Sequence, residues 1–246
     1  MSGGDELAEG AWWHELVVGG RDWIEHEVNH IILALLVTLI ATLLIRISSC
    51  LPAYQSKRPR RPLGEARDGR KTVKTMIYFG SGGHTAEMIR LVRGLDPAKY
   101  EPVTFAIGHT DVTSQAKVRA AQLALEPRAR WLRIYRNREV KQSWLSTSGT
   151  ALWSLVQALY VLSRNRPQLL ICNGPGTCVS LVYSAFALRV LGLADTTVVF
   201  VESYCRTRAL SLTGRLVYPL ADRFVVHWPA LLTDKHPRAE FIGRIV

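Results

Sequence analysis

The longest apolar stretch of the chain runs without a charged residue from Val28 to Ile45 and is almost entirely aliphatic from Ile31 onward. At about 1.5 Å per residue, a helix of this length rises about 27 Å, which is close to the hydrocarbon thickness of a bilayer. The stretch is long for a signal-peptide core, and no small-residue cleavage motif follows it. The pattern predicts one membrane-spanning helix over residues 28–46, with a cleaved signal peptide or a buried core helix as the alternatives.

Charge differs sharply on the two sides of this stretch. Residues 1–30 hold seven acidic residues and one arginine, whereas residues 46–74 hold nine basic residues and two acidic ones. Basic flanks of membrane helices stay in the cytosol. We therefore expect a lumenal segment at residues 1–27, a basic juxtamembrane linker at 47–72 and a cytosolic domain at 73–246.

From Val73 onward, short apolar runs alternate with amphipathic stretches. The apolar runs predict strands at residues 73–79, 102–107, 131–135, 168–172, 196–201, 223–228 and 240–242. Helical spacing predicts helices from Met88 to Leu95 and over residues 115–125, 150–163 and 178–191, the third with Leu152, Leu155, Val156, Leu159 and Leu162 on one face. The predicted fold is α/β, a single Rossmann-like, doubly wound parallel sheet behind one N-terminal transmembrane helix.

Composition excludes several classes of protein. Apolar residues make up 48% of the chain, which is too many for a disordered one. The four cysteines show no CxxC spacing and no nearby histidine at ligand spacing, so neither a disulfide scaffold nor a structural zinc site is expected. No metal and no cofactor are predicted. The net charge of +11 indicates an anionic partner, which is a nucleic acid, a phosphorylated substrate or an anionic membrane.

One basic cluster bears on this choice of partner. It runs from Arg133 to Lys141 and is flanked by Trp131 and Trp144. Interleaved aromatic residues suit nucleic acid, but no nucleic-acid-binding module accompanies them. A solvated loop is the simplest interpretation, and a phosphate-rich lipid surface suits a tethered domain better than nucleic acid does. Nucleic acid is therefore not expected as a partner.

Two glycine-rich turns follow predicted strands. They are Gly80-Ser81-Gly82-Gly83-His84-Thr85 and Asn173-Gly174-Pro175-Gly176-Thr177. Ligands of parallel sheets bind beyond the carboxyl ends of the strands, and a glycine-rich turn before a helix brings N–H groups close to phosphate. The two turns are expected to face one anion from two sides. The first turn is neither a P-loop nor a dinucleotide fingerprint, and a plain turn capped by Thr85 is its alternative.

A third polar stretch, Glu202-Ser203-Tyr204-Cys205-Arg206, follows the strand over residues 196–201. Glu202 and Arg206 either line the same crevice as the glycine-rich turns or form a local salt bridge at a helix start. His84 is a candidate general base or phosphate ligand, and a histidine bonded by loop backbone is the alternative. The residues alone leave these alternatives open.

In combination, the three stretches resemble the asparagine-linked glycosylation protein 14 family over about residues 73–246. The stretch from Arg136 to Ser143, the segment from Tyr218 to Phe224 and the single N-terminal anchor fit this family too. The resemblance departs at His227, where glutamine is expected before Trp228. The family is the membrane-anchored subunit of the transferase that adds the second GlcNAc to dolichyl-diphosphate-GlcNAc.

The resemblance implies the N-terminal half of a two-domain GT-B glycosyltransferase, in which a separate soluble catalytic subunit carries the UDP-GlcNAc site. The chain would be the membrane-anchoring, acceptor-binding subunit in the endoplasmic reticulum membrane, with the nuclear envelope as an alternative location, and would be inactive alone. By motif, the implied catalytic residues are His84 and Glu202. The implied acceptor-binding residues are Gly80, Ser81, Gly82, Gly83, Thr85, Asn173, Gly174, Pro175, Gly176, Thr177 and Arg206.

The apolar C-terminal tail is expected to contact the partner subunit through Phe241, Ile242, Ile245 and Val246. Its alternative role is to close the sheet of this domain.

Two other functions compete with this interpretation. One is a membrane-anchored recruitment scaffold with no direct part in catalysis. The other is a complete single-chain enzyme acting on nucleotides, which the lack of a donor-binding nucleotide motif before Val246 disfavours.

Overall fold

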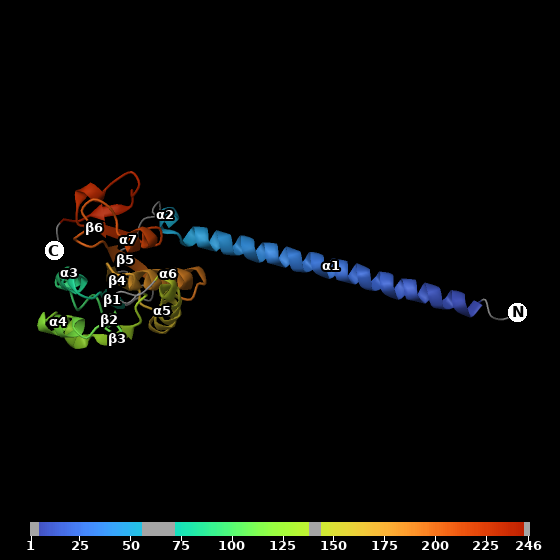
Figure 1. Ribbon diagram of the computed structural model, residues 1–246, viewed down its shortest axis with the longest axis horizontal. Coiled ribbons are helices and arrows are strands. Elements are labelled where there is room, and N and C mark those ends of the chain that lie inside the picture. Colours follow the sequence, from blue (N-terminus) through green and yellow to red (C-terminus); the bar gives the residue numbers. More distant parts are fainter. Residues whose placement is uncertain (1–4, 56–71, 138–143, 244–246) are drawn as a thin grey trace. The chain divides into compact units, whose positions relative to one another are not determined.

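The computed structural model of the protein describes residues 5–55, 72–137 and 144–243 (Figure 1). The chain divides into two compact units, Met1–Ser48 and Ser49–Val246. The described residues of the first unit are helical, and the second unit contains the sheet. We call the second the globular unit.

Helix α1 spans Asp5–Cys50. Its stretch His26–Cys50 has a mean hydropathy of 2.6, and none of its most apolar window is buried. By length and composition this stretch can cross a membrane, in agreement with the anchor predicted at residues 28–46. The helix begins earlier than predicted, because the acidic N-terminal segment carries no apolar period that would have indicated it. At its other end, Ser49 and Cys50 already belong to the globular unit.

Within the described part of the chain, seven strands form one sheet in the order β3-β2-β1-β4-β5-β6-β7, and every neighbouring pair is parallel. The strands are β1 (Thr75–Phe79), β2 (Val103–Gly108), β3 (Arg130–Ile134), β4 (Leu169–Asn173), β5 (Thr197–Val201), β6 (Arg223–Val226) and β7 (Ala239–Phe241). Chain order reverses between β1 and β4, which places the topological switch point between these two strands.

Helices cover both faces of the sheet. The helices of the globular unit are α2 (Pro52–Gln55), α3 (Gly83–Val92), α4 (Ser114–Ala120), α5 (Trp144–Asn165), α6 (Thr177–Val190) and α7 (Leu212–Val217), with short 3-10 turns at Glu126–Arg128 and Pro229–Leu231. Helices α3 and α4 contact each other on one side of the strands, and α5, α6 and α7 form the layer on the other side (Figure 1). The predicted doubly wound parallel sheet is confirmed.

Alternation along the buried strands divides the core into two halves. On β1, Met76 and Tyr78 belong to the cluster that packs under α5 and α6, whereas Ile77 and Phe79 belong to the cluster under α3. Successive side chains of a strand point to opposite faces, so a strand that is apolar at every position is buried on both. All five residues of β1 are buried.

Three local predictions differ from the structure. Helix α4 ends at Ala120, well before residue 125, because the chain turns at Gln122, whose φ is +48°. Helix α7 was not predicted, since six residues are too few to show a period. In α5, Leu152 and Val156 are exposed while Leu162 is buried, so the predicted apolar face is divided between core and surface.

Candidate functional site

The two glycine-rich turns touch at the carboxyl ends of β1 and β4. These strands are neighbours in the sheet, with Tyr78 opposite Cys172. A Cβ at Gly80 would lie 2.8 Å from Pro175, and a Cβ at Gly174 would lie 2.6 Å or less from three atoms of the His84 ring. Because Gly80 and Gly174 lack side chains, the two turns can pack against each other with the His84 imidazole between them.

The first turn ends in the amino terminus of α3. Gly82 has a φ of +67°, a conformation that glycine adopts without strain, and no side chain of the described residues caps the helix. A Cβ at Gly83 would meet open space. The free N–H groups of this helix start thus face an open, electropositive position that suits an anion.

Thr85 does not cap this helix, contrary to the alternative considered above. Its side chain is fully buried, donates a hydrogen bond to the Gly80 carbonyl oxygen and shares another with Ser114 at 2.7 Å. Ser114 is bonded in turn to Asp111. Burial raises the pKa of Asp111, but hydrogen bonds from Ser114 and Thr113 and the charge of Arg136 outweigh it, so the pKa is lowered. Thr85 thus ties the first turn to the start of α4.

Glu87 lies at the centre of the site, and the sequence analysis missed it. Its Oε2 accepts a hydrogen bond from Asn173 Nδ2 at 3.0 Å and lies 3.5 Å from His84 Nδ1. Its Oε1 accepts a hydrogen bond from Ser203 Oγ at 3.1 Å. One carboxylate therefore joins helix α3, the second turn and the stretch after β5.

The carboxylate of Glu87 favours the ionised state. Burial raises its pKa, but the nearby His84 imidazole, together with hydrogen bonds from Ser203 and the Tyr204 backbone, lowers the pKa overall. His84 keeps 31% of its side chain exposed, while its Nδ1 is buried. The arrangement is an imidazole whose buried nitrogen faces a carboxylate and whose ring is partly open to solvent.

Two buried residues of the second turn hold it in place. Asn173 is fully buried and donates hydrogen bonds to Glu87 and to the carbonyl oxygen of His84. Thr177 is also buried and is the first residue of α6. Asn137 borders this turn, because its Oδ1 accepts a hydrogen bond from Ser180 at 2.8 Å. Of the basic cluster, Arg138 and Lys141 lie outside the described residues, whereas Arg133 donates to the carbonyl oxygen of His109 and Arg136 lies 3.7 Å from Asp111.

Glu202 occupies a different environment from the one expected. Its side chain is fully buried, and its oxygens accept hydrogen bonds from the backbone N–H groups of Ser203 and Ser211, both at 2.9 Å. A Cβ at Gly214 would lie 2.2 Å from Oε2. The carboxylate thus organises the start of α7. In this conformation it has no surface with which to touch a substrate, and its catalytic role stays a prediction.

The stretch after Glu202 forms a turn, because the Arg206 N–H donates to the Ser203 carbonyl oxygen. Arg206 is exposed, and no helix begins there, so the expected salt bridge at a helix start has no helix to stabilise. Behind this turn, His227 is buried, and within the described residues neither of its ring nitrogens has a hydrogen-bond partner. Burial lowers the pKa of His227, against the charges of Glu87 and Glu202.

The predicted site residues therefore fall into two groups. Exposed or half-buried positions that can contact a ligand are Ser81, Gly82, Gly83, His84, Pro175, Gly176 and Arg206. Buried positions that hold the two turns together are Gly80, Thr85, Asn173, Gly174, Thr177 and Glu202. The spacing His84-x-x-Glu87, which is one helical turn, is the sequence signal that could have identified Glu87.

The C-terminal residues have a mixed position. Strand β7 pairs with β6, with Phe241 opposite Val226, so the backbone does close the sheet of this domain. The side chains of Phe241 and Ile242 are nevertheless 37% and 57% exposed. Ile245 and Val246 lie outside the described residues. The partner contact expected of these four residues stays a prediction.

The chain is similar to a known family of proteins. Residues 75–245 match the family described as "Oligosaccharide biosynthesis protein Alg14 like". The chain is 42% identical over 185 residues to the "UDP-N-acetylglucosamine transferase subunit ALG14" of Rattus norvegicus, covering 72% of this chain and 85% of that one. It is 40% identical over 172 residues to the subunit of the same name from Schizosaccharomyces pombe, covering 68% and 81%.

Among solved structures, the crystal structure of Acinetobacter baumannii MurG aligns with a TM-score of 0.48 at 14% identity, over 64% of this chain and 42% of that one. The family match covers the whole sheet, both glycine-rich turns and the segment with Glu87. The chain belongs to the Alg14-like family of oligosaccharide biosynthesis proteins.

Proposed function

We propose that this protein is the membrane-anchoring, acceptor-binding subunit of a UDP-GlcNAc transferase that adds the second GlcNAc to dolichyl-diphosphate-GlcNAc. The relatives carry the name of a UDP-N-acetylglucosamine transferase subunit, which supports a role as one part of a glycosyltransferase. The sheet would serve as one half of a GT-B enzyme. A soluble catalytic subunit would supply the UDP-GlcNAc site, and this chain would be inactive alone.

One observation carries the proposal: the imidazole of His84 lies between two glycine-rich turns, with its buried nitrogen against an ionised carboxylate. Nδ1 lies 3.5 Å from Glu87 Oε2. The open start of α3 is suited to the diphosphate of a lipid-linked acceptor, since its N–H groups lack side-chain caps. The acceptor sugar would then lie over the exposed face of the His84 ring.

In this arrangement Nε2 of His84 takes the proton from an acceptor hydroxyl as that oxygen attacks the sugar of the donor, and UDP departs with the electrons of the broken bond. Glu87 stabilises the imidazolium that forms and fixes the orientation of the ring. Asn173 and Ser203 hold Glu87 in place. Each of these residues comes from a different segment of the sheet edge, so the geometry depends on the whole fold.

The remaining parts of the proposal concern location and assembly. The apolar stretch His26–Cys50 would span the endoplasmic reticulum membrane, with residues 1–27 in the lumen and 73–246 in the cytosol. The exposed side chains of Phe241 and Ile242 would contact the catalytic subunit. Protection of the globular unit from protease in sealed microsomes would contradict this orientation.

The decisive experiment uses the full chain co-expressed with its catalytic partner in membranes. Transfer from UDP-GlcNAc to lipid-diphosphate-GlcNAc is measured for the wild type and for His84→Ala, and co-purification of the partner is measured in the same membranes. A general base predicts that turnover falls by roughly 10²–10⁴-fold with the complex intact. A phosphate ligand predicts instead that the larger effect is on the KM of the acceptor.

The alternative function is a recruitment scaffold with no direct part in catalysis. Under that alternative, His84→Ala leaves both kcat and KM unchanged as long as the partner remains bound. Turnover of UDP-GlcNAc by the purified chain without any partner would contradict both functions and favour a complete enzyme. The matched control is His109→Ala, because this exposed histidine follows β2 and its ring stacks on Tyr135.

A further inference from the structure

His227 is a buried histidine at the same edge of the sheet as the two glycine-rich turns. It immediately follows β6, which is parallel to its neighbours, so it lies where the strands end. Only 1% of the residue is exposed, and within the described residues neither ring nitrogen has a hydrogen-bond partner. A buried polar group without a partner is costly to the fold and rare. An imidazole in such a place therefore calls for a role other than packing.

The turn after Glu202 connects His227 with Glu87. The ring of His227 meets the ring of Tyr204 edge to face, with the centroids 5.8 Å apart. Trp228, the next residue, donates a hydrogen bond from Nε1 to the carbonyl oxygen of Tyr204 at 2.7 Å. In the same turn, Ser203 Oγ donates to Glu87 Oε1 at 3.1 Å. The chain after β6 thus packs on the turn that holds the Glu87 carboxylate.

Two carboxylates act on His227. They are joined by Ser203, whose N–H donates to Glu202 Oε1 at 2.9 Å while its hydroxyl donates to Glu87. Burial lowers the pKa of His227, and the charges of Glu87 and Glu202 oppose that effect. Cys178 of α6 lies near Glu202, but burial raises the pKa of its thiol, so it adds no charge.

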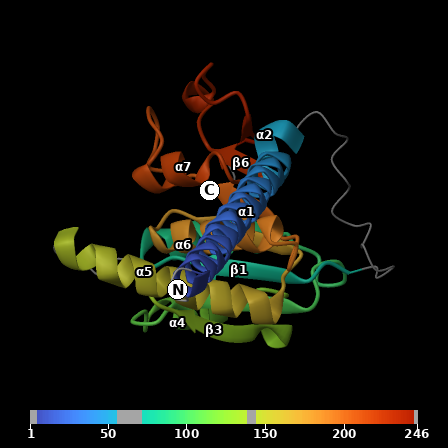
Figure 2. The ribbon, with the colours of Figure 1, turned by 90° about the vertical axis from the view of Figure 1, so that its right-hand side faces the viewer.

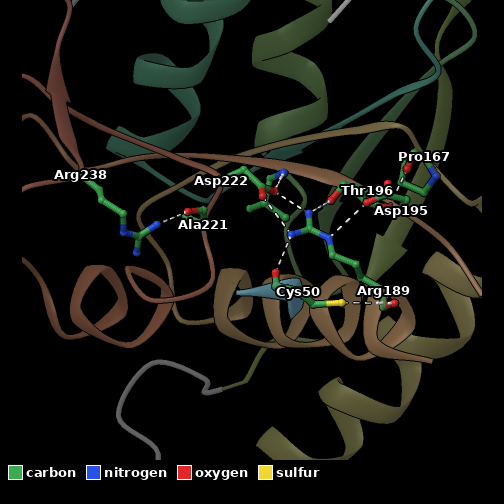
Figure 3. A network of polar contacts seen from close by, with 9 residues as sticks. Cys50, Pro167, Arg189, Asp195, Thr196, Ala221, Asp222 and Arg238 are labelled. Atoms are coloured by element: carbon green, nitrogen blue, oxygen red, sulfur yellow. Dashed lines mark hydrogen bonds and ion pairs between the residues drawn. The ribbon is translucent and has the colours of Figure 1, made fainter. Parts of the chain in front are cut away.

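A buried carboxylate at the opposite edge of the sheet is paired with a cation. Arg189 of α6 makes two bonds to Asp222, at 2.9 Å through Nη1 and at 2.6 Å through Nη2, and a third to the carbonyl oxygen of Cys50 (Figure 3). Asp222 immediately precedes β6 and His227 immediately follows it, so this one strand, beside α7 in Figure 2, separates the two residues.

The carboxylates near His227 are paired differently. Among the described residues, neither Glu87 nor Glu202 forms an ion pair with a lysine or an arginine. In this part of the chain, the groups that can become cations beside them are the imidazoles of His84 and His227. Each of these imidazoles can take or lose its proton near neutral pH. The charge balance around Glu87 therefore changes with pH.

We propose that His227 is a positioning residue for the transfer reaction and acts on His84 through the carboxylate of Glu87. The inference rests on the proposed function, in which Glu87 stabilises the imidazolium of His84. While His227 is neutral, Glu87 serves His84 alone. A proton on His227 adds a second positive charge beside the same carboxylate, and this charge opposes formation of the imidazolium at His84. The rate of transfer thus depends on a buried residue that does not touch the substrate.

The first test measures kcat for the full chain, co-expressed with its catalytic partner in membranes and normalised to folded protein. His227→Gln keeps a donor and an acceptor but takes up no proton. We expect variant and wild type to agree within about twofold at about pH 8, and the wild type to fall about tenfold below the variant at about pH 5, the effect of one pKa unit. A ratio of the two rates that is constant over this range overturns the proposal, whether or not the variant is slower.

The matched control is His236→Gln. Nδ1 of His236 lies 3.0 Å from Thr233 Oγ, and its ring meets Tyr218 rather than the turn after Glu202. This variant is expected to keep the wild-type dependence of kcat on pH. The same change of profile in His236→Gln as in His227→Gln would assign the effect to loss of any histidine and overturn the proposal.

The second test does not depend on transfer. The pKa of His227 is measured in the full chain in detergent by NMR of histidine labelled with ¹³C at Cε1. The signal is identified by its absence in His227→Gln, or in His227→Asn if the first variant does not fold. Because the charge of Glu87 raises this pKa, Glu87→Gln is expected to lower it by about half a unit or more.

Glu126→Gln is the control for the second test, since Glu126 pairs with Arg119 at 3.6 Å. It is expected to leave the pKa of His227 as in the wild type. An unchanged pKa in Glu87→Gln overturns the proposal whatever His84→Ala does to transfer. Failure of this inference is therefore distinguishable from failure of the proposed function.

Discussion

The imidazole of His84 fills the space that the missing side chain of Gly174 leaves open: a Cβ at position 174 would lie 2.1 Å from Nδ1. Gly174 also has a φ of +76°. Gly174→Ala is therefore expected to strain the backbone and to clash with the His84 ring. We expect a loss of more than about 1 kcal/mol in the free energy of unfolding and a marked fall in kcat, because the ring must leave Glu87.

The control for this substitution is Gly94→Ala, since a Cβ at Gly94 would have no atom within 4 Å. It is expected to leave both unfolding and transfer unchanged. Thermal unfolding in detergent and transfer kinetics in membranes measure the two effects. Wild-type kcat in Gly174→Ala would show that the position of the His84 ring is not critical.

Glu87→Gln tests whether the carboxylate orients His84. The amide keeps the size of the side chain and removes its charge, so the imidazolium loses its stabilising partner. We expect kcat to fall by roughly 10²-fold or more and the acid limb of the pH–rate profile to move toward lower pH, with the KM of the acceptor little changed. A profile of wild-type shape would restrict Glu87 to a structural role.

Glu202→Gln separates the buried carboxylate from catalysis. The substitution weakens the hydrogen bonds that Glu202 accepts from Ser203 and Ser211. Ser211 is the N-cap residue of helix α7. We expect unfolding to become easier by about 1–3 kcal/mol while kcat per folded molecule is retained. The measurement is transfer normalised to folded protein below the unfolding transition. A loss of kcat comparable to that of His84→Ala would instead assign Glu202 to the reaction.

His227 predicts a specific pH dependence of stability. Burial lowers its pKa in the folded protein below the value of 6.5 for a free histidine, so the unfolded chain binds the proton more readily. Stability is therefore undiminished above 6.5, decreases as the pH falls below it, and reaches its full loss below the folded pKa. His227→Gln is expected to flatten this dependence below pH 6.5. Denaturant unfolding at several pH values measures it, and an unchanged slope would contradict the prediction.

Arg189→Met is expected to destabilise the globular unit by about 3–5 kcal/mol, because it leaves the carboxylate of Asp222 and the carbonyl oxygen of Thr196 without their cation. Arg164→Met is the control, since Arg164 is exposed and its loss should stay within about 0.5 kcal/mol. Thermal unfolding of the full chain in detergent compares the two. Equal stability of both variants would mean that the network around Arg189 contributes little.

The sheet could be predicted from the sequence because its strands are continuous apolar runs, as strands buried on both faces must be. Both glycine-rich turns could be placed at one edge, because the carboxyl ends of parallel strands lie at the same edge of the sheet. Helix α7 could not be predicted from the sequence, because its start depends on a hydrogen bond from Gly214 to the side chain of Ser211 and on Glu202. These contacts form only in the folded chain, so no hydrophobic periodicity in the sequence indicates them.

The candidate site was predicted less completely than the sheet. His84 was found because it follows a glycine-rich turn, but the residue that holds its ring, Glu87, lies inside an amphipathic helix and looks like an ordinary helix carboxylate. Conversely, Glu202 follows a buried strand as a catalytic residue often does, yet its oxygens are occupied by backbone donors. Position at a strand end indicates the site, and only the contacts decide which side chains face a ligand.

The network around Arg189 lies at the edge of the sheet where strands β5 and β6 begin, since Thr196 and Asp222 immediately precede them. The two glycine-rich turns lie at the other edge, where β1 and β4 end. On the proposed anchoring, a pull from the membrane helix would reach the globular unit at Cys50, whose contact with Arg189 links it to α6 and to the residues before β5 and β6. Bilayer tension would then act at this edge of the sheet, while the spacing between His84 and Glu87 is set at the other.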